Sequence, residues 1–339
     1  MSENIRRPTA LLVMSPVLTS GLLTEAHRSR LAQMCNLAAQ EPLATLDDAL
    51  AERLLADAEI LLTSWGCPTL DEEVLARAPR LEAIMHAAGT VKNHVTEAVF
   101  ERGIRVCSAA AANALPVAEF ALASILFANK RVFELQRQYR EVRGFRFWSR
   151  EAPGLGNFGK RIGLVGLSRI GRRLARLLQP FDLEVVAWDP TLDAAAIVEQ
   201  GARPASLDEL LTSCDVTSLH APLLPETQGL IDARRLALMP DGATLVNTAR
   251  GGLVDAKALE RELVSGRLRA VIDTTDPEVL ASDSPLYDLP NVFLTPHIAG
   301  AQGAETGRMV DLALDEIERF VVGEPLLHEV RREDWSRIA

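Results

Sequence analysis

The chain has 339 residues, of which 48% are hydrophobic and 24% charged, and its formal net charge is −10 at pH 7. This length is enough for two domains, and the composition is that of a globular protein with a sizeable core. The acidic balance argues against nucleic acid as a partner, because phosphate backbones are bound by basic surfaces.

The first part of the chain alternates short apolar runs with helical patterns. The runs at residues 9–14, 60–63, 81–86 and 104–108 have the length of buried strands, and residues 22–35 and 72–78 have helical spacing. Such alternation predicts an α/β domain built on a parallel sheet.

One long helical pattern then extends from Pro116 to about Arg140, with apolar residues at helical spacing. Pro116 suits the first turn of a helix, where its missing N–H is not needed. This helix is expected to bridge two domains, to pack against a second subunit, or simply to cover a sheet, and the pattern leaves these alternatives open.

A second alternation follows and is longer than the first. Strand-like runs lie at residues 161–166, 183–189, 215–220, 243–248, 269–274 and 291–295, with helical patterns at 170–178, 233–238 and 256–264. Six strands with crossover helices predict a doubly wound dinucleotide-binding domain. A helix from about Glu305 to Val321 closes the pattern. We therefore expect domains at 1–113 and 114–298, with 299–339 returning to the first.

The cysteines and the apolar runs bear on the cellular compartment. Cys35, Cys67, Cys107 and Cys214 are far apart and form no C-x-x-C pair, which is typical of reduced thiols in a cytoplasmic protein. The N-terminus lacks a signal-peptide pattern, and no apolar run approaches the roughly 18 residues expected of a membrane span. Neither a membrane nor a secreted location is expected.

A glycine-rich turn follows the strand at 161–166. Gly166, Ser168 and Gly171 occupy the three glycine places of a dinucleotide fingerprint. The first glycine permits the tight turn, the second lets the backbone approach the pyrophosphate, and the third lets helix and strand pack closely. Ser168 departs from this pattern, since its Cβ narrows the approach, although its hydroxyl can donate a hydrogen bond.

Asp189 ends the next strand, eighteen residues after Gly171. A carboxylate at this place accepts hydrogen bonds from the adenosine ribose and repels a 2′-phosphate. No arginine that could bind such a phosphate stands at residues 190–192. NAD rather than NADP is therefore predicted, with a helix or turn cap as the alternative role of Asp189.

Three later apolar runs each end in a group capable of chemistry, namely Arg250, Glu278 and His297. If the runs are parallel strands, these groups emerge at one edge of one sheet. An arginine fork suits a carboxylate, an imidazole transfers protons near neutral pH, and a carboxylate can orient that imidazole. Taken alone, Arg250 is also typical of a structural ion pair, and His297 of an ordinary loop residue. The glycines Gly251-Gly252 beside Arg250 favour a close approach of the backbone to a ligand.

Several motifs together resemble the D-isomer-specific 2-hydroxyacid dehydrogenase family over nearly the whole chain. They are residues 165–171 (VGLSRIG), 218–223 (SLHAPL), 246–255 (VNTARGGLVD), 294–300 (LTPHIAG), and 111–114 (AANA) followed by 117–119 (VAE). The resemblance implies an α/β protein with two domains, a Rossmann NAD-binding domain and a discontinuous, flavodoxin-like substrate domain, with the active site in the cleft.

The resemblance also implies roles for single residues. Arg250 would bind the carboxylate and keto oxygen of a 2-keto acid, His297 would be the acid/base, and Glu278 would pair with His297. Backbone amides near Ala88, Gly89 and Thr90 would hold the other carboxylate oxygen. The residues expected at NAD are Gly166, Ser168, Arg169, Ile170, Gly171, Asp189, His220, Ala221, Pro222, Thr248, Ala249, Arg250, Asp273, His297 and Gly300. No metal is expected, and members of the family are commonly homodimers built through the cofactor domain.

The chain departs from the family pattern in the loop that carries Glu278. Val279 stands where proline usually follows the glutamate, and Thr275 stands where an aromatic residue is common. Asp276 is a rival partner for His297, but the five-residue spacing from Asp273 favours Glu278.

The expected activity is NAD-dependent interconversion of a D-2-hydroxy acid and a 2-keto acid. Glyoxylate or hydroxypyruvate reduction is the best specific expectation, with a phosphoglycerate dehydrogenase-like activity close to it, although no regulatory domain follows Val322. The substrate side chain would lie near Trp65, Thr90 and Trp148. The alternative is an NAD(H)-sensing protein that resembles the transcriptional corepressors of this fold.

Overall fold

The computed structural model describes residues 6–152, 154–335 and 337–338. The chain divides into two compact units, which are described one at a time. Unit 1 comprises Met1–Asn113 and Ala301–Ala339, and unit 2 comprises Ala114–Gly300. The first division falls inside a single helix, α5 (Ala110–Asn129).

Unit 1 is built on a five-stranded parallel sheet in the order β2-β1-β3-β4-β5. The strands are β1 (Thr9–Val13), β2 (Asn36–Leu37), β3 (Ile60–Thr63), β4 (Ala83–His86) and β5 (Arg105–Ser108). This is the flavodoxin-like strand order, so the expected architecture of the first domain is confirmed. Strand β2 was not predicted, because its two residues carry no apolar periodicity.

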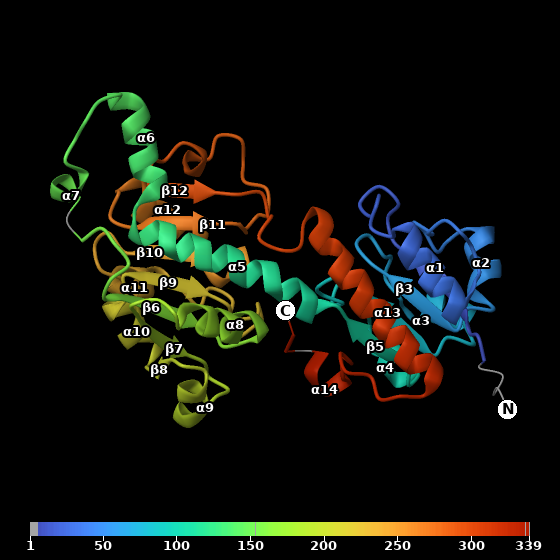
Figure 1. Ribbon diagram of the computed structural model, residues 1–339. Coiled ribbons are helices and arrows are strands. Elements are labelled where there is room, and N and C mark those ends of the chain that lie inside the picture. The colour runs from blue at the N-terminus through green and yellow to red at the C-terminus, as the bar shows by residue number, and fades with distance from the viewer. Residues whose placement is uncertain (1–5, 153, 336, 339) are drawn as a thin grey trace. The chain divides into compact units, whose positions relative to one another are not determined.

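Helices cover both faces of this sheet, as a parallel sheet requires. Helices α1 (Glu25–Met34) and α13 (Thr306–Val322) lie together on one face, where Leu12, Met85 and Leu314 share one core (Figure 1). The other face packs against α2 (Ala49–Leu55), α3 (Glu72–Arg77) and α4 (Glu97–Glu101).

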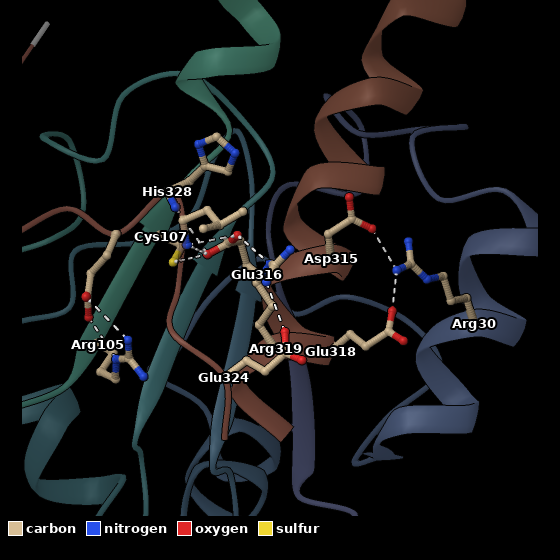
Figure 2. Close-up of polar contacts among 11 residues, drawn as sticks. Arg30, Arg105, Cys107, Asp315, Glu316, Glu318, Arg319, Glu324 and His328 are labelled. Atoms are coloured by element: carbon tan, nitrogen blue, oxygen red, sulfur yellow. Dashed lines mark hydrogen bonds and ion pairs between the residues drawn. The ribbon is translucent and has the colours of Figure 1, made fainter. Parts of the chain in front are cut away.

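The segment after α13 returns to the edge strand β5. Val330 N donates to Val106 O at 2.7 Å, and Arg105 Nε donates to Glu329 Oε1 at 2.8 Å. The carboxylate of Glu316 in α13, whose residue is only 1% exposed, accepts hydrogen bonds from the Leu327 amide at 2.9 Å and from the Cys107 thiol at 3.3 Å (Figure 2). A buried carboxylate therefore fastens this segment to the sheet.

Unit 2 contains a seven-stranded parallel sheet in the order β12-β11-β10-β9-β6-β7-β8. Its strands are β6 (Lys160–Val165), β7 (Leu183–Trp188), β8 (Arg203–Pro204), β9 (Val216–Leu219), β10 (Thr244–Asn247), β11 (Arg269–Ile272) and β12 (Val292–Leu294). Read from β8, this is the Rossmann order with one further strand, which confirms the predicted fold. The six expected strands are all present, and β8 is the one the sequence analysis missed.

Both faces of this sheet are also covered. Helices α5, α8 (Arg169–Leu178) and α9 (Ala194–Glu199) share one core with it, and α10 (Leu207–Ser213), α11 (Ala233–Leu238) and α12 (Ala256–Val264) share the other. Figure 1 shows α5 and α8 in front of the strands of unit 2. The remaining elements of the chain are α6 (Val132–Val142), α7 (Trp148–Glu151), α14 (Arg332–Trp335), η1 (Gly251–Leu253), η2 (Pro285–Tyr287) and η3 (Gly303–Glu305).

The expectation of one helix from Pro116 to about Arg140 was wrong. The chain forms α5 and α6 with a break between them, where Arg131 adopts a left-handed backbone conformation with φ of 50°. A left-handed residue ends the helical hydrogen-bond pattern. Helix α5 begins at Ala110, so Pro116 lies inside the helix and not in its first turn.

The expectation about membrane-length runs also needs correction. Among the described residues one helix, α5, is long and apolar enough to cross a membrane by length and composition alone. Its residues Ala118, Ala121 and Ile125 are fully buried in the core of unit 2. A core helix passes the same test, so this feature is weak evidence for a span.

Candidate active site

The carboxyl ends of the strands of unit 2 are aligned in register. Leu219 pairs with Val165 and with Asn247, and Ile272 pairs with Asn247 and with Leu294. Arg250 follows β10, Glu278 follows β11 and His297 follows β12, so all three groups leave the same edge of one sheet, as expected.

The side chains of His297 and Glu278 are in direct contact. Nδ1 of the imidazole is hydrogen-bonded to Oε1 of the carboxylate. The expected pairing with Glu278, and not with the rival Asp276, is therefore confirmed. Both side chains are partly exposed, with 44% of His297 and 68% of Glu278 accessible, so a ligand can reach them from the solvent side.

His297 is held in an uncommon backbone conformation, with φ of 55°. Its amide donates to the carbonyl of Asp273 at 3.0 Å. The Asp273 carboxylate is buried and accepts hydrogen bonds from the Ile298 amide at 2.8 Å, the Ala299 amide at 2.9 Å and the Thr295 hydroxyl at 2.6 Å. Asp273 therefore shapes the loop that presents His297, a role that the sequence analysis did not anticipate. Its expected place at NAD stays a prediction.

Arg250 lies in the loop after β10 and is half-buried. Burial lowers the pKa of Arg250, whereas the negative charge of Glu278 raises it. The carboxylate is therefore close enough to attract the guanidinium. Asn247 fixes this loop, because its amide group donates to the Arg250 carbonyl at 2.9 Å and accepts from the Ala249 amide at 3.1 Å.

Gly251 brings the loop of Arg250 against the loop of Glu278. A Cβ on Gly251 would lie 2.1 Å from the carbonyl carbon of Thr275 and 2.4 Å from the Asp276 nitrogen. Only glycine permits this approach. The two loops that carry the arginine and the carboxylate are therefore packed backbone to backbone.

The glycine-rich turn has the geometry that the fingerprint requires. Gly166 has φ of 93°, and a Cβ there would lie 2.7 Å from the Ala221 nitrogen. A Cβ on Gly171 would lie 2.2 Å from the Gly166 oxygen. The Ser168 hydroxyl donates to the His220 carbonyl at 2.9 Å, and so the serine ties the turn to the end of β9.

The N-terminus of α8 fits a phosphate group. Ser168 is the N-cap residue, and its side chain forms no cap hydrogen bond within the helix. The first amides of a helix bind anions when no side chain satisfies them. Arg169 is exposed at this end and Ile170 is half-buried. The residues present therefore fit the pyrophosphate of a dinucleotide.

Asp189 lies at the end of β7, as expected, and its carboxylate already has local partners. Oδ2 accepts from the Leu167 amide in the glycine-rich turn at 2.7 Å. Oδ1 accepts from the Thr191 amide at 2.8 Å and from its hydroxyl at 2.7 Å. Asp189 thus caps the turn at Thr191 and also accepts a hydrogen bond from the glycine-rich turn. Its expected hydrogen bond to the ribose stays a prediction.

Orphaned polar atoms follow three neighbouring strands of unit 2. Within the described residues, His220 Nδ1, Thr248 Oγ1 and Thr274 Oγ1 are buried without a hydrogen-bond partner. They follow β9, β10 and β11. Unsatisfied buried polar atoms are uncommon and call for an explanation such as a missing ligand. Thr248 and His220 were expected at the cofactor, whereas Thr274 was not singled out.

The His220 ring is held in its neutral form. Its Nε2 is hydrogen-bonded to the Ser218 hydroxyl at 2.8 Å, and burial lowers its pKa to about 4. A ring in this state serves as a hydrogen-bonding group and not as a proton donor at neutral pH. The backbone of the next residue, Ala221, packs against Gly166. Pro222 follows Ala221 at the edge of the sheet.

The turn at Ala88, Gly89 and Thr90 belongs to unit 1 and follows β4. The Ser108 hydroxyl donates to the Gly89 carbonyl at 2.5 Å. A Cβ on Gly89 would lie 3.2 Å from Nδ2 of Asn113. The turn is thus fixed from two sides, and its expected role at the substrate carboxylate stays a prediction.

The described residues contain no group of three His, Cys, Asp or Glu side chains that could hold a metal ion.

Comparisons with known proteins agree with this site. The family model described as "D-isomer specific 2-hydroxyacid dehydrogenase, NAD binding domain" matches residues 122–299. D-3-phosphoglycerate dehydrogenase of Mycobacterium tuberculosis is 38% identical over 277 residues, covering 80% of this chain and 50% of that protein. The chain therefore spans about half the length of such relatives.

Two further proteins match over nearly their full length. (S)-Sulfolactate dehydrogenase of Chromohalobacter salexigens is 34% identical over 310 residues, covering 90% of this chain and 98% of that protein. The structure of apo D-mandelate dehydrogenase from Rhodotorula graminis aligns with a TM-score of 0.80 and 26% identity, over 96% of this chain and 98% of that one.

These relatives are named as dehydrogenases, and the corepressor-like alternative is not favoured. The matched domain is an NAD-binding domain, which agrees with the glycine-rich turn and with the orphaned atoms at the strand ends. NAD is the cofactor of unit 2. The chain belongs to the D-isomer specific 2-hydroxyacid dehydrogenase family.

Proposed function

We propose that this protein is an NAD-dependent D-2-hydroxyacid dehydrogenase that interconverts a 2-keto acid and a D-2-hydroxy acid. One observation carries the proposal, namely the contact between His297 and Glu278 at the sheet edge where Arg250 also emerges. A proton donor, its charge partner and an anchor for a carboxylate are what keto-acid reduction requires of the protein.

The residues divide this work among themselves. NADH, when bound, supplies the hydride, and the protein supplies placement and the proton. Arg250 binds the substrate carboxylate with its planar fork and polarises the neighbouring keto oxygen. His297 gives a proton from the ring to that oxygen, while Glu278 stabilises the imidazolium form through Nδ1.

The reverse reaction uses the same groups with the proton moving the other way. Oxidation needs a neutral His297 that accepts the hydroxyl proton, and reduction needs the protonated ring. We therefore expect reduction to tolerate mildly acidic pH and oxidation to need alkaline pH. Matching pH–rate profiles in the two directions would contradict this assignment.

Several 2-keto acids are candidates for the substrate. The relatives are named for phosphoglycerate, sulfolactate and mandelate, which are all 2-hydroxy acids. The sequence alone favours glyoxylate or hydroxypyruvate. Oxidation of NADH with a panel that also includes pyruvate, branched-chain and aryl keto acids tests both the activity and this expectation.

His297→Ala provides the direct test of the mechanism. This variant should lose turnover with every keto acid, because the proton donor is missing, and should still bind NADH. Quenching of protein fluorescence by NADH measures that binding. Normal turnover by the variant would show that the proton comes from another group.

We further propose that the protein is a homodimer associated through unit 2 and works in the cytoplasm, without a nucleic-acid or membrane partner. Helix α6 has no buried residue, and the aromatic side chains of Tyr139, Phe145 and Phe147 are exposed around its end. An exposed apolar patch of this kind supports a protein–protein contact. The four free thiols and the acidic charge support the location and the absence of a nucleic-acid partner.

Tyr139→Ser combined with Phe145→Ser tests the dimer. Light scattering after size-exclusion chromatography should give twice the chain mass for the wild type and a lower mass for the variant. A monomeric wild-type protein at micromolar concentration would contradict the proposal.

A further inference from the structure

An open hollow of about 550 Å³ lies within unit 1. Its walls come from Leu18, Ser20, Gly21 and Leu22 after β1, from Trp65 after β3, and from Ala301, Gln302, Gly303 and Thr306 before and at the start of α13. None of the side chains that line it carries a charge, and its lining includes Leu18, Leu22 and Trp65. Trp65 is 38% exposed, so a large apolar surface faces solvent where a ligand can cover it.

The first two walls of the hollow are fixed to each other. The Ser15 amide donates to the Trp65 carbonyl at 2.9 Å. A Cβ on Gly66 would lie 2.5 Å from the Cβ of Ser15, so the two loops approach as closely as a glycine permits. The Thr19 amide and hydroxyl both donate to the Ser15 carbonyl, at 3.0 and 2.6 Å. The hollow is therefore formed before any ligand arrives.

One wall of the hollow and the turn that is expected to hold the substrate carboxylate follow neighbouring strands of the sheet. Strands β3 and β4 are neighbours, with Thr63 paired to His86, so Trp65 and the Ala88–Thr90 turn leave the sheet side by side. Asn113 connects the turn to the third wall. Its Oδ1 accepts from the Ala301 amide at 2.9 Å, and its Nδ2 is the group that a Cβ on Gly89 would meet.

We propose that this hollow receives the side chain of the 2-keto acid and selects side chains that are apolar and uncharged. This inference rests on the proposed function. A phosphate or sulfonate group in the hollow would lose hydration without gaining a cationic partner, which is unfavourable. Anionic groups are normally recognised by arginine or lysine, and the lining holds neither.

The size of the hollow points in the same direction. Ligand pockets for small molecules typically measure about 300–1,000 Å³, so this volume has room for a branched or aromatic side chain. Glyoxylate has no side chain to place there and would leave the apolar surface of Trp65 and Leu18 exposed to water. Burial of that surface is the free-energy gain that separates a larger keto acid from glyoxylate.

Steady-state kinetics with NADH tests the inference. The probes are 4-methyl-2-oxopentanoate and phenylpyruvate as apolar acids, 3-phosphohydroxypyruvate as an anionic one, and glyoxylate as an acid without a side chain. We expect kcat/KM for at least one apolar acid to exceed that for the phosphorylated acid by about tenfold or more, which is the typical scale of discrimination by an apolar pocket. A preference for the phosphorylated acid would overturn the inference.

Variants of the lining separate this role from a general effect on structure. Trp65→Ala should lower kcat/KM for the apolar acids by about tenfold more than it lowers kcat/KM for glyoxylate. Leu18→Arg, at a side chain that is 66% exposed, should improve the phosphorylated acid relative to the apolar ones. Val17→Ala is the matched control, because Val17 is in the same loop, 84% exposed and outside the lining.

The outcomes distinguish this inference from the proposed function. If none of the four acids, glyoxylate included, supports NADH oxidation, the proposed function itself is wrong. If glyoxylate is reduced but Trp65→Ala changes all acids equally, or Leu18→Arg leaves their ranking unchanged, only the inference about the hollow is wrong.

Discussion

The Nδ1 atom of His297 is hydrogen-bonded to the carboxylate of Glu278, which comes from the loop after the neighbouring strand. The contact leaves the opposite edge of the ring for the substrate and stabilises the charged form of the imidazole. It also sets the ring orientation, because a residue with φ of 55° has few alternative ways to present its side chain.

Glu278→Gln should slow catalysis without abolishing it. The amide can still orient the ring but no longer stabilises its positive charge, so kcat for reduction should fall by about 10- to 100-fold. Asp276→Asn is the matched control in the same loop and should keep most activity. A wild-type kcat for reduction in Glu278→Gln would show that the carboxylate has no electrostatic role.

Arg250→Lys should weaken substrate use far more than cofactor binding. A lysine keeps the charge but loses the planar pair of donors that matches a carboxylate. We expect kcat/KM for keto acids to fall by about 100-fold or more, as for the loss of an oxyanion donor, while fluorescence titration still detects NADH binding. A fall of less than about threefold would mean that the substrate carboxylate binds elsewhere.

Gly251→Ala should disturb the loop of Glu278 even though the substitution adds one methyl group. The new Cβ would meet the Thr275 carbonyl carbon at 2.1 Å, and backbone atoms must move to make room. Overpacking of this kind typically costs about 1–3 kcal/mol, so both Tm and kcat should fall. Gly307→Ala is the control, since its Cβ would meet only the His27 ring at 3.9 Å.

Buried histidines should make the folded state less stable as the pH falls. Burial lowers the pKa of His94 and of His220 to about 4, and lowers the pKa of His86 well below its usual value. Since the unfolded chain takes up protons near its unperturbed pKa of about 6.5, stability should be constant above that pH and should decline between about 6.5 and 4. Each such residue contributes up to about 1.4 kcal/mol per pH unit.

Urea denaturation across this pH range measures the effect. His94→Asn should flatten the decline. A slope that is the same in His94→Asn and in the wild type would mean that His94 is protonated in the folded protein as readily as in the unfolded one.

The sequence predicted the sheets and the strand-end groups because both depend on local patterns. Parallel strands are apolar runs, and their carboxyl ends share an edge whatever their order, which places Arg250, Glu278 and His297 together. Strands β2 and β8 have two residues each and give no such pattern. The break at Arg131 was missed because a left-handed residue of this type has no compositional signal.

Contacts between residues far apart in the sequence could not be predicted from local sequence patterns. The use of Asp273 to shape the His297 loop depends on amides more than twenty residues away. The hollow in unit 1 depends on the packing of Gly66 against Ser15, which only the folded chain brings together. The sequence identified Trp65 as a candidate for the substrate side chain, but it did not indicate an uncharged lining.

The return of α13 to unit 1 has a consequence for biosynthesis. Residues Val310, Leu314 and Ile317 complete one face of the sheet whose strands end at Ser108, and the Glu316 carboxylate secures the segment that follows. The ribosome therefore makes all of unit 2 while one face of the first sheet is still uncovered. Synthesis of unit 1 therefore begins first and ends last, and in that interval its uncovered apolar face favours aggregation.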